Sequence, residues 1–130
     1  MAANIDFVVD ASIILAWLLP DEREEKVNRI FAAYRQKKTH IYAPKLLIYE
    51  LMNGLKSAIL RKRIDWLKAK RAIEVFKQMK FDLIDQDGEE EAILKLASKL
   101  NLSVYDASYA VLAKKLKLQL MSLDKKLQNL

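Results

Sequence analysis

The sequence predicts an α/β protein built on a parallel sheet. Short apolar, β-branched runs alternate with helical segments along the chain, and the 130 residues include only two glycines and two prolines, with no repeat. Strands that alternate with helices form parallel sheets that helices cover on both faces. A chain of this length is typical of one domain with one core, so we expect a single domain over residues 1–130.

The first half of the chain is expected to contain two strands and three helices. An apolar run stops at Asp10, and Pro20 is expected to end the helix that follows. Pro44 suits the first position of a helix, because that position needs no backbone N–H. The expected elements are, in order, a strand over residues 5–9, helices over 11–19 and 21–37, a strand over 40–43 and a helix over 44–60.

The second half continues this alternation. Ser103 is expected to cap a helix that carries Asp106, and Asp124 closes the last strand. The expected elements are a helix over residues 65–80, a strand over 81–84, a helix that follows Asp87 and Gly88 and runs to 100, a helix from 103, a strand over 118–123 and a short final helix.

Composition narrows the classes of function. Lysine and arginine number 23 against 17 aspartates and glutamates, a formal net charge of +6. This charge suits a nucleic-acid partner, although lysine-rich surfaces also serve solubility. The absence of cysteine excludes disulfides, thiolate metal sites and cysteine nucleophiles. The apolar runs are shorter than the roughly 20 residues of a membrane span, and no secretory signal pattern is present, so we expect a soluble, cytoplasmic protein with no membrane partner.

Four carboxylates are the candidate functional residues. Asp10 and Asp124 each follow a strand directly, where α/β proteins bind ligands, although each also suits a helix cap. Asp106 lies three residues after Ser103, which is also the spacing of a capping box. Glu50 lies on the flank of an apolar helical stripe, where an unpaired acid is costly and either a cation or a lysine would explain it. Each residue alone leaves both interpretations open.

Together, the four acids would require a bound cation. Two carboxylates about 4 Å apart repel by roughly 4 kcal/mol at an effective dielectric constant of 20, and a whole domain is stable by only about 5 to 15 kcal/mol. Oxygen ligands without sulfur or imidazole suit Mg²⁺ or Mn²⁺. His40 is the only histidine, which excludes a pair of histidines as acid and base, and we expect it at the surface or at a strand edge. Glycine-rich phosphate loops are absent, so metal-assisted hydrolysis is the chemistry that remains.

The acids lie in segments that resemble a known family. The segments VVDASIILAW (8–17), YELMNGL (49–55), VYDASYAVLA (104–113) and LMSLDKKL (120–127) resemble the four acidic motifs of the PIN-domain nucleases, in the same order. The size is closest to the VapC-type toxin ribonucleases of toxin–antitoxin pairs. The resemblance implies a three-layer α/β/α sandwich on a parallel sheet of four or five strands, and an enzyme that hydrolyses RNA to leave a 5′-phosphate and a 3′-hydroxyl.

The resemblance also implies roles for particular residues. One or two Mg²⁺ or Mn²⁺ ions would be bound by four residues, Asp10, Glu50, Asp106 and Asp124. Three further residues would orient these ligands or the phosphate: Ser12, Asn53 and Ser122. Family members usually continue into a fifth strand after the last acid, whereas this sequence stops six residues after Asp124, which leaves the number of strands open. The implied partners are RNA, a protein antitoxin that inserts a segment into the acidic pocket, and a second copy of the chain.

Two alternatives remain. A phosphatase of the haloacid-dehalogenase kind could use Asp10, but it needs a second aspartate two positions later, where this chain has Ser12. A non-catalytic RNA-binding protein could use the acids as caps and ion-pair partners. In either an enzyme or a binding protein, a basic cluster could form a track for the RNA backbone, or it could be merely solvated. It contains Arg61, Lys62, Arg63, Lys68, Lys70 and Arg71.

Overall fold

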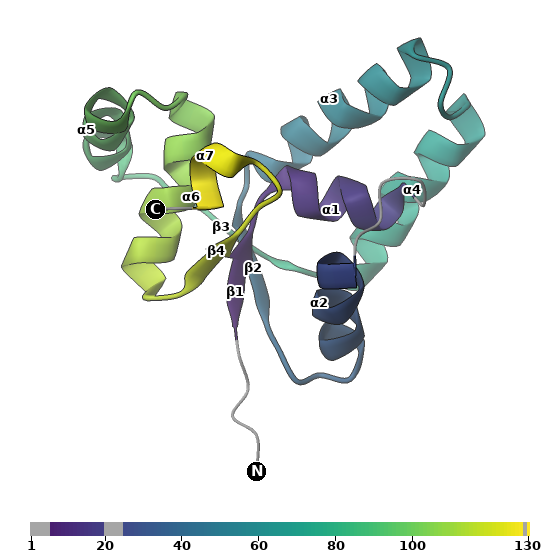
Figure 1. Ribbon diagram of the computed structural model, residues 1–130, viewed down its shortest axis with the longest axis horizontal. Helices are drawn as coiled ribbons and strands as arrows, with labels where there is room; N and C mark the ends of the chain where they lie inside the picture. Colours follow the sequence, from purple (N-terminus) through teal and green to yellow (C-terminus); the bar gives the residue numbers. More distant parts are fainter. Residues whose placement is uncertain (1–5, 20–24, 129) are drawn as a thin grey trace.

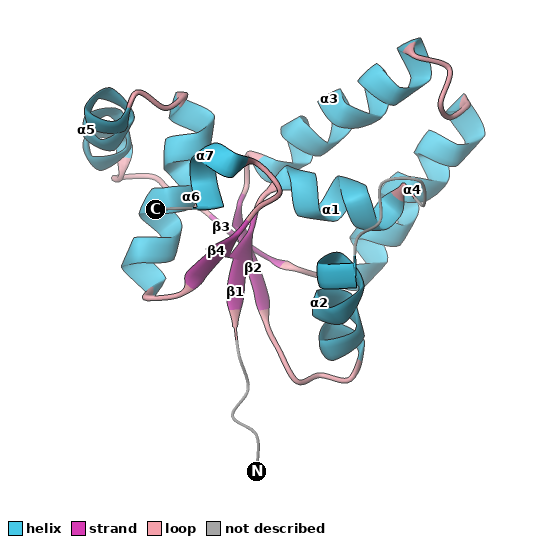
Figure 2. Ribbon diagram, in the orientation of Figure 1, coloured by secondary structure: helices cyan, strands magenta, loops and turns pink. Residues whose placement is uncertain are grey.

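A computed structural model describes residues 6–19, 25–128 and 130, and it has a parallel sheet between two layers of helices (Figures 1 and 2). The four strands of this described part are all parallel, in the order β3-β2-β1-β4. They are β1 (Phe7–Val9), β2 (Ile41–Pro44), β3 (Asp82–Ile84) and β4 (Gln119–Met121). The predicted α/β/α architecture is confirmed.

The helices divide between the two faces of the sheet. Four lie on one side, to the right in Figure 1: α1 (Ala11–Leu18), α2 (Glu25–Arg35), α3 (Leu47–Leu60) and α4 (Trp66–Met79). Three lie on the other side: α5 (Glu90–Leu100), α6 (Val104–Leu116) and α7 (Lys125–Gln128). On that side α6 packs directly on β1, β2 and β4, and α5 packs on α6 as an outer helix. None of the helices in the described part of the chain is long and apolar enough to cross a bilayer.

The order of the strands creates a switch point beside β1. The chain moves from β1 to β2 and β3 on one side, and β4 returns to pair with the other side of β1, with Val8 opposite both Tyr42 and Leu120. Val8 and Val9 are buried because helices cover both faces, which explains the continuous apolar run in this strand. Ligands of open parallel sheets bind at the carboxyl ends of strands on either side of such a switch point.

One predicted boundary is wrong. Pro44 is the last residue of β2, opposite Ile84 in β3, and α3 begins three residues later at Leu47. A proline at a strand end removes only one donor from the ladder, and here the next residue supplies it, since the Lys45 N–H donates to the Ile84 carbonyl at 3.1 Å. Some predicted positions lie outside the described residues: residue 5 of the first predicted strand, Pro20, and residues 21–24 of the second predicted helix. The last strand is shorter than predicted, because β4 ends at Met121, and Asp124 therefore lies in the loop after the strand and does not follow it directly. The other predicted elements are present with slightly shifted ends.

Aromatic packing holds the first layer of helices together. Trp17 of α1 stacks on Phe31 of α2, with ring centroids 4.3 Å apart, and Phe31 meets the edge of Phe81 at 6.0 Å. Such ring pairs add to the free energy gained from apolar burial. The close approach of α1 and α3 depends on Gly54, since a Cβ there would lie 2.4 Å from Leu15 Cδ1. Asp10 directly precedes α1 and Glu50 lies in the first turn of α3, so the packing of these two helices brings the starts of both to the carboxyl ends of β1 and β2.

Candidate functional site

Asp10 lies at the carboxyl end of β1 and is also the N-cap of α1. Its Oδ1 accepts hydrogen bonds from the Ser12 hydroxyl at 2.6 Å and the Ile13 N–H at 3.3 Å, and its Oδ2 accepts one from the Ser122 hydroxyl at 2.5 Å. The residue is only 6% exposed. Burial raises the pKa of this carboxyl, although the hydrogen bonds from Ser12, Ser122 and Ile13 oppose the rise. Capping and a site role are therefore compatible at Asp10.

The two serines fasten the loop after β4 to Asp10. The Ser12 hydroxyl oxygen accepts the Leu123 N–H at 2.9 Å, and the Ser122 hydroxyl oxygen accepts the Asp124 N–H at 2.9 Å. Each serine thus donates to the carboxylate and accepts from the loop. The sequence singled out both serines, and the structure places both in direct contact with Asp10.

Glu50 is half-buried in the first turn of α3, and its partner is a tyrosine. The Tyr109 hydroxyl donates to Glu50 Oε1 at 2.6 Å. Burial raises the pKa of the Glu50 carboxyl, the hydrogen bond from Tyr109 lowers it, and the charges of Asp106 and Asp10 raise it further. Within the described residues Glu50 has no ion pair, so a lysine does not explain its position.

Tyr109 is a functional candidate that the sequence reasoning missed. It is 1% exposed, in the middle of α6. Burial, followed by the hydrogen bond to Glu50 and the charges of Glu50, Asp10 and Asp106, raises the pKa of its phenol, which keeps the hydroxyl protonated as a donor. Its spacing, three residues after Asp106 and so on the same helical face, was the available signal.

Asp106 lies in the first turn of α6 and is half-buried. Its N–H donates to the Ser103 hydroxyl oxygen at 3.0 Å, which confirms Ser103 as the N-cap. The reciprocal half of a capping box is missing, because no hydrogen bond or ion pair to the Asp106 carboxylate is found in the described part of the chain. The charge of Asp106 acts instead on Glu50 and Tyr109.

The remaining candidates lie farther from this group. The Asp124 Oδ1 accepts the Lys126 N–H at 3.0 Å at the start of α7, so its side chain serves as a cap, while its backbone is held by Ser122. Asn53 is exposed on α3, with no side-chain hydrogen bond to any described residue. His40 is exposed, as predicted, and directly precedes β2. It therefore lies at the amino ends of the parallel strands, whereas Asp10 lies at their carboxyl ends. The structure thus brings together Asp10, Glu50 and Asp106, with Asp124 in the adjoining loop.

The chemistry of these side chains fits a small, hard cation. Among residues 6–19, 25–128 and 130, no three acidic or histidine side chains are already arranged as metal ligands. However, the charges of Asp10 and Asp106 both act on Glu50, and none of these three carboxylates has a cationic partner in this part of the chain. Glu50 Oε2 and the Asp106 carboxylate accept no hydrogen bond from the described residues, so both are available as ligands after side-chain rotation. An oxygen-only donor set of this kind suits Mg²⁺ or Mn²⁺.

The fold and the acidic residues together define the class of protein. It is an α/β protein with a carboxylate site at the carboxyl ends of its parallel strands, beside the switch point. The sequence model of the PIN domain matches residues 7–130, and the chain belongs to the PIN-domain family.

Similar proteins cover almost the whole chain. The sequence is 32% identical over 122 residues to Ribonuclease VapC9 of Mycobacterium tuberculosis, spanning 94% of this chain and 88% of that protein. It is 31% identical over 124 residues to Ribonuclease VapC3 of Pyrobaculum aerophilum, spanning 92% and 90%. The crystal structure of PAE2754 from Pyrobaculum aerophilum matches with a TM-score of 0.73 at 27% identity, over 96% of this chain and 85% of that one.

Proposed function

We propose that this chain is a divalent-metal-dependent endoribonuclease, and the toxin of a VapBC-type toxin–antitoxin pair. The observation that carries the proposal is the convergence of Asp10, Glu50 and Asp106 without a cationic partner among the described residues. Membership of the PIN-domain family and two relatives named as ribonucleases support it. The same membership removes the support for a phosphatase of the haloacid-dehalogenase kind.

The site residues would have distinct tasks. One or two Mg²⁺ or Mn²⁺ ions would lower the pKa of a bound water and neutralise charge on the phosphate. Asp10 and Asp106 would be the first ligands, with Glu50 and Asp124 contributing directly or through water. Ser12 and Ser122 hold the Asp10 carboxylate in one orientation through their hydroxyl groups.

Tyr109 and Asn53 would complete the site. The Tyr109 hydroxyl holds Glu50 Oε1, which leaves Oε2 to face the cation. Asn53 is exposed one helical turn after Glu50, where its amide can hydrogen-bond a phosphate.

A basic surface for the RNA backbone supports the assignment. The loop between α3 and α4 and the first turns of α4 carry exposed cations, which are Arg61, Lys62, Arg63, Lys68, Lys70 and Arg71. Such a cluster favours RNA through the release of counterions. We further propose that the chain is a single-domain cytoplasmic protein, forms a homodimer and binds a protein antitoxin that supplies a positive group to the acidic site.

Cleavage of a circular RNA tests the proposal, because only an endonuclease can open a circle. Labelled circular single-stranded RNA is incubated with the protein and Mn²⁺ or Mg²⁺, and with EDTA in a parallel sample. We expect metal-dependent linear products with a 5′-phosphate, and no product from Asp10→Asn.

Asp65→Asn is the matched control, because it removes one charge at the N-cap of α4 and leaves a good capping residue. It should cut like the wild type. Full activity of Asp10→Asn, or equal cleavage in EDTA, would show that the cleavage comes from a contaminating nuclease. Either result would favour the non-catalytic RNA-binding alternative for this chain.

A further inference from the structure

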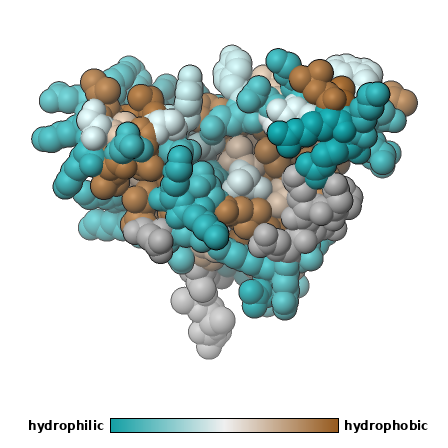
Figure 3. Space-filling view, turned by 45° about the horizontal axis from the view of Figure 1, so that its top comes forward, coloured by the Kyte–Doolittle hydropathy of each residue, from teal (hydrophilic) through white to brown (hydrophobic). Residues whose placement is uncertain are grey.

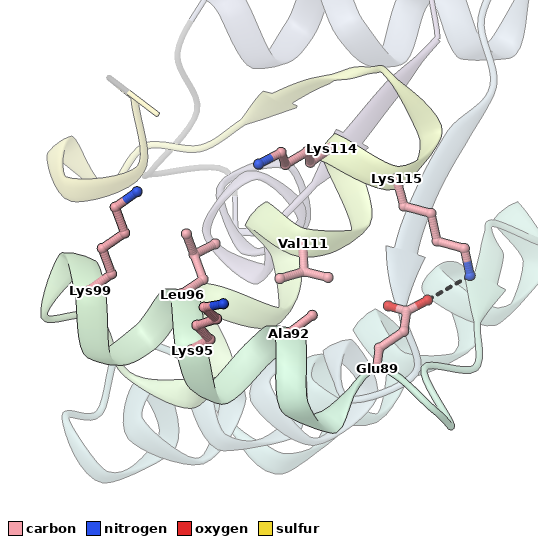
Figure 4. Close-up of a pocket in the computed structure, with 8 residues that line it drawn as sticks. All are labelled: Glu89, Ala92, Lys95, Leu96, Lys99, Val111, Lys114 and Lys115. Carbon is pink, nitrogen blue, oxygen red and sulfur yellow. Dashed lines mark hydrogen bonds and ion pairs between the residues drawn. The ribbon is translucent and has the colours of Figure 1, made fainter.

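A cleft between α5 and α6 has a composition unlike that of the acidic site. It has a volume of about 590 Å³ and is lined by residues of both helices (Figure 4). Its aliphatic floor consists of Ala92, Leu96 and Val111. Volumes of several hundred cubic ångströms are typical of binding clefts.

Lysines surround this floor. The lysine rim consists of Lys95, Lys99 and Lys114, all exposed, and none of the three has an ion pair or a side-chain hydrogen bond to the described residues. A fourth lysine, Lys115, is already paired, since its Nζ lies 2.6 Å from Glu89 Oε1 (Figure 4). Three positive charges are therefore uncompensated beside an apolar surface. Figure 3 shows apolar side chains among hydrophilic ones on this side of the molecule, at the left.

The cleft is separate from the acidic site. Val111 lies two residues after Tyr109 on α6, which turns it by about 200° around the helix axis, away from the sheet and from Glu50. Lys114 lies eight residues after Asp106, a rise of about 12 Å along the helix. A molecule bound in the cleft would therefore leave the carboxylates accessible.

The chemistry of the cleft favours a polypeptide over RNA. Sites for single-stranded nucleic acid combine basic groups with aromatic rings on which bases stack, whereas the described residues that line this cleft are lysines, aliphatic residues and one glutamate. An aliphatic floor between lysines complements a helix whose leucine-like side chains lie between acidic ones, a known mode of helix-in-groove recognition. Complementary charge would orient such a helix along the cleft.

We propose that the cleft between α5 and α6 binds an acidic amphipathic helix of a partner protein, with its apolar side chains on the aliphatic floor and its carboxylates paired with the lysine rim. This surface goes beyond the proposed nuclease function, because binding here requires no cleavage of RNA.

Binding of a synthetic peptide tests this proposal. The probe is a fluorescent helical peptide with leucines on one face flanked by glutamates, and its control has the same composition in scrambled order. Fluorescence anisotropy is measured with the wild type and with the cleft variant K95E/K99E/K114E. We expect the wild type to bind the designed peptide more tightly than the scrambled one. The cleft variant should bind the designed peptide at least about tenfold more weakly than the wild type does.

A charge-matched variant and a floor variant complete the test. K68E/K70E/R71E changes the same number of charges on α4, across the sheet, and should bind the peptide like the wild type. A92E places an acid in the cleft at an exposed helical position, so it weakens binding even if the triple variant fails to fold. Equal binding of the two peptides, or undiminished binding by A92E, overturns the proposal. If single-stranded RNA in EDTA, rather than the peptide, loses affinity in the cleft variant, the cleft is an RNA track and the proposal is wrong.

Discussion

The hydrogen bond between Tyr109 and Glu50 is directly testable by Tyr109→Phe. The substitution keeps the buried ring and removes only the hydroxyl, which donates to Glu50 Oε1 at 2.6 Å. Hydrogen bonds to charged groups contribute about 1.5 to 3 kcal/mol, and Glu50 is half-buried, so we expect a loss of about 2 kcal/mol in the free energy of unfolding at pH 7. For a chain of this size that corresponds to a fall in Tm of roughly 7 °C.

The pH dependence of this loss identifies its cause. The pKa of Glu50 is already raised above its ordinary value of 4.5, and removal of a hydrogen bond that lowers it raises the pKa further. A carboxyl with a raised folded-state pKa reduces stability as pH rises from its unfolded-state pKa through its folded-state pKa. The difference between wild type and Tyr109→Phe should therefore be largest at neutral pH and should shrink as pH falls toward 4.5.

Urea denaturation of a double-mutant cycle measures the coupling. Tyr109→Phe is combined with Glu50→Gln, and we expect a coupling free energy of about 1 kcal/mol at pH 7. Tyr34→Phe is the matched control, because the Tyr34 hydroxyl donates to the Met79 carbonyl at 2.5 Å, on the other side of the sheet. Its cost should not depend on Glu50. The reasoning would be refuted if Tyr109→Phe lowered the free energy of unfolding equally in the wild type and in Glu50→Gln. It would also be refuted if the loss were the same at neutral pH and near pH 4.5.

Three further predictions concern charge, metal binding and packing. Without metal, Asp10→Asn should raise the free energy of unfolding by about 1 kcal/mol. The substitution removes a repulsion of roughly 3 kcal/mol, the value for two carboxylates about 6 Å apart at an effective dielectric constant of 20, and it loses one charge-assisted hydrogen bond of about 2 kcal/mol. A lower Tm by calorimetry would contradict this prediction. Mn²⁺ at about one hundred times its Kd should stabilise the wild type by about 2.7 kcal/mol, and an equal rise in Tm for Asp106→Asn would exclude that residue as a ligand. Gly54→Val should cost about 1 to 3 kcal/mol in urea denaturation through its clash with Leu15, whereas Ser57→Val, exposed on the same helix, should cost less than 1 kcal/mol.

The element order was predictable because its signals are local. Apolar runs, helical periodicity and caps such as Ser103 are properties of neighbouring residues, and the structure keeps them. Pro44 was misassigned because a proline fits both the first turn of a helix and the end of a strand, and only pairing with β3 distinguishes the two positions.

The sequence could propose the site as a set of acids, but it could not predict their contacts. Tyr109 and Glu50 are 59 positions apart, so their hydrogen bond depends on how α6 is rotated relative to α3, which no local pattern encodes. Asp124 presents the reverse case, because its side chain can cap α7 or approach Asp10, and the structure has the cap. The lysine rim could not be predicted from the sequence for a similar reason. Its three lysines belong to two helices, and only the packing of these helices side by side brings the lysines around one cleft.

The bond between Asp10 and Ser122 has a consequence for synthesis of the protein. The two residues are 112 positions apart, so a growing polypeptide presents Asp10, Glu50 and Asp106 before it presents the serine that fixes the first of them. Until β4 emerges and pairs with β1, Asp10 Oδ2 lacks its hydroxyl donor and the carboxylate is not held in place. An unfinished copy on the ribosome would therefore lack one of the hydroxyl groups that orient Asp10 until translation has passed the last strand.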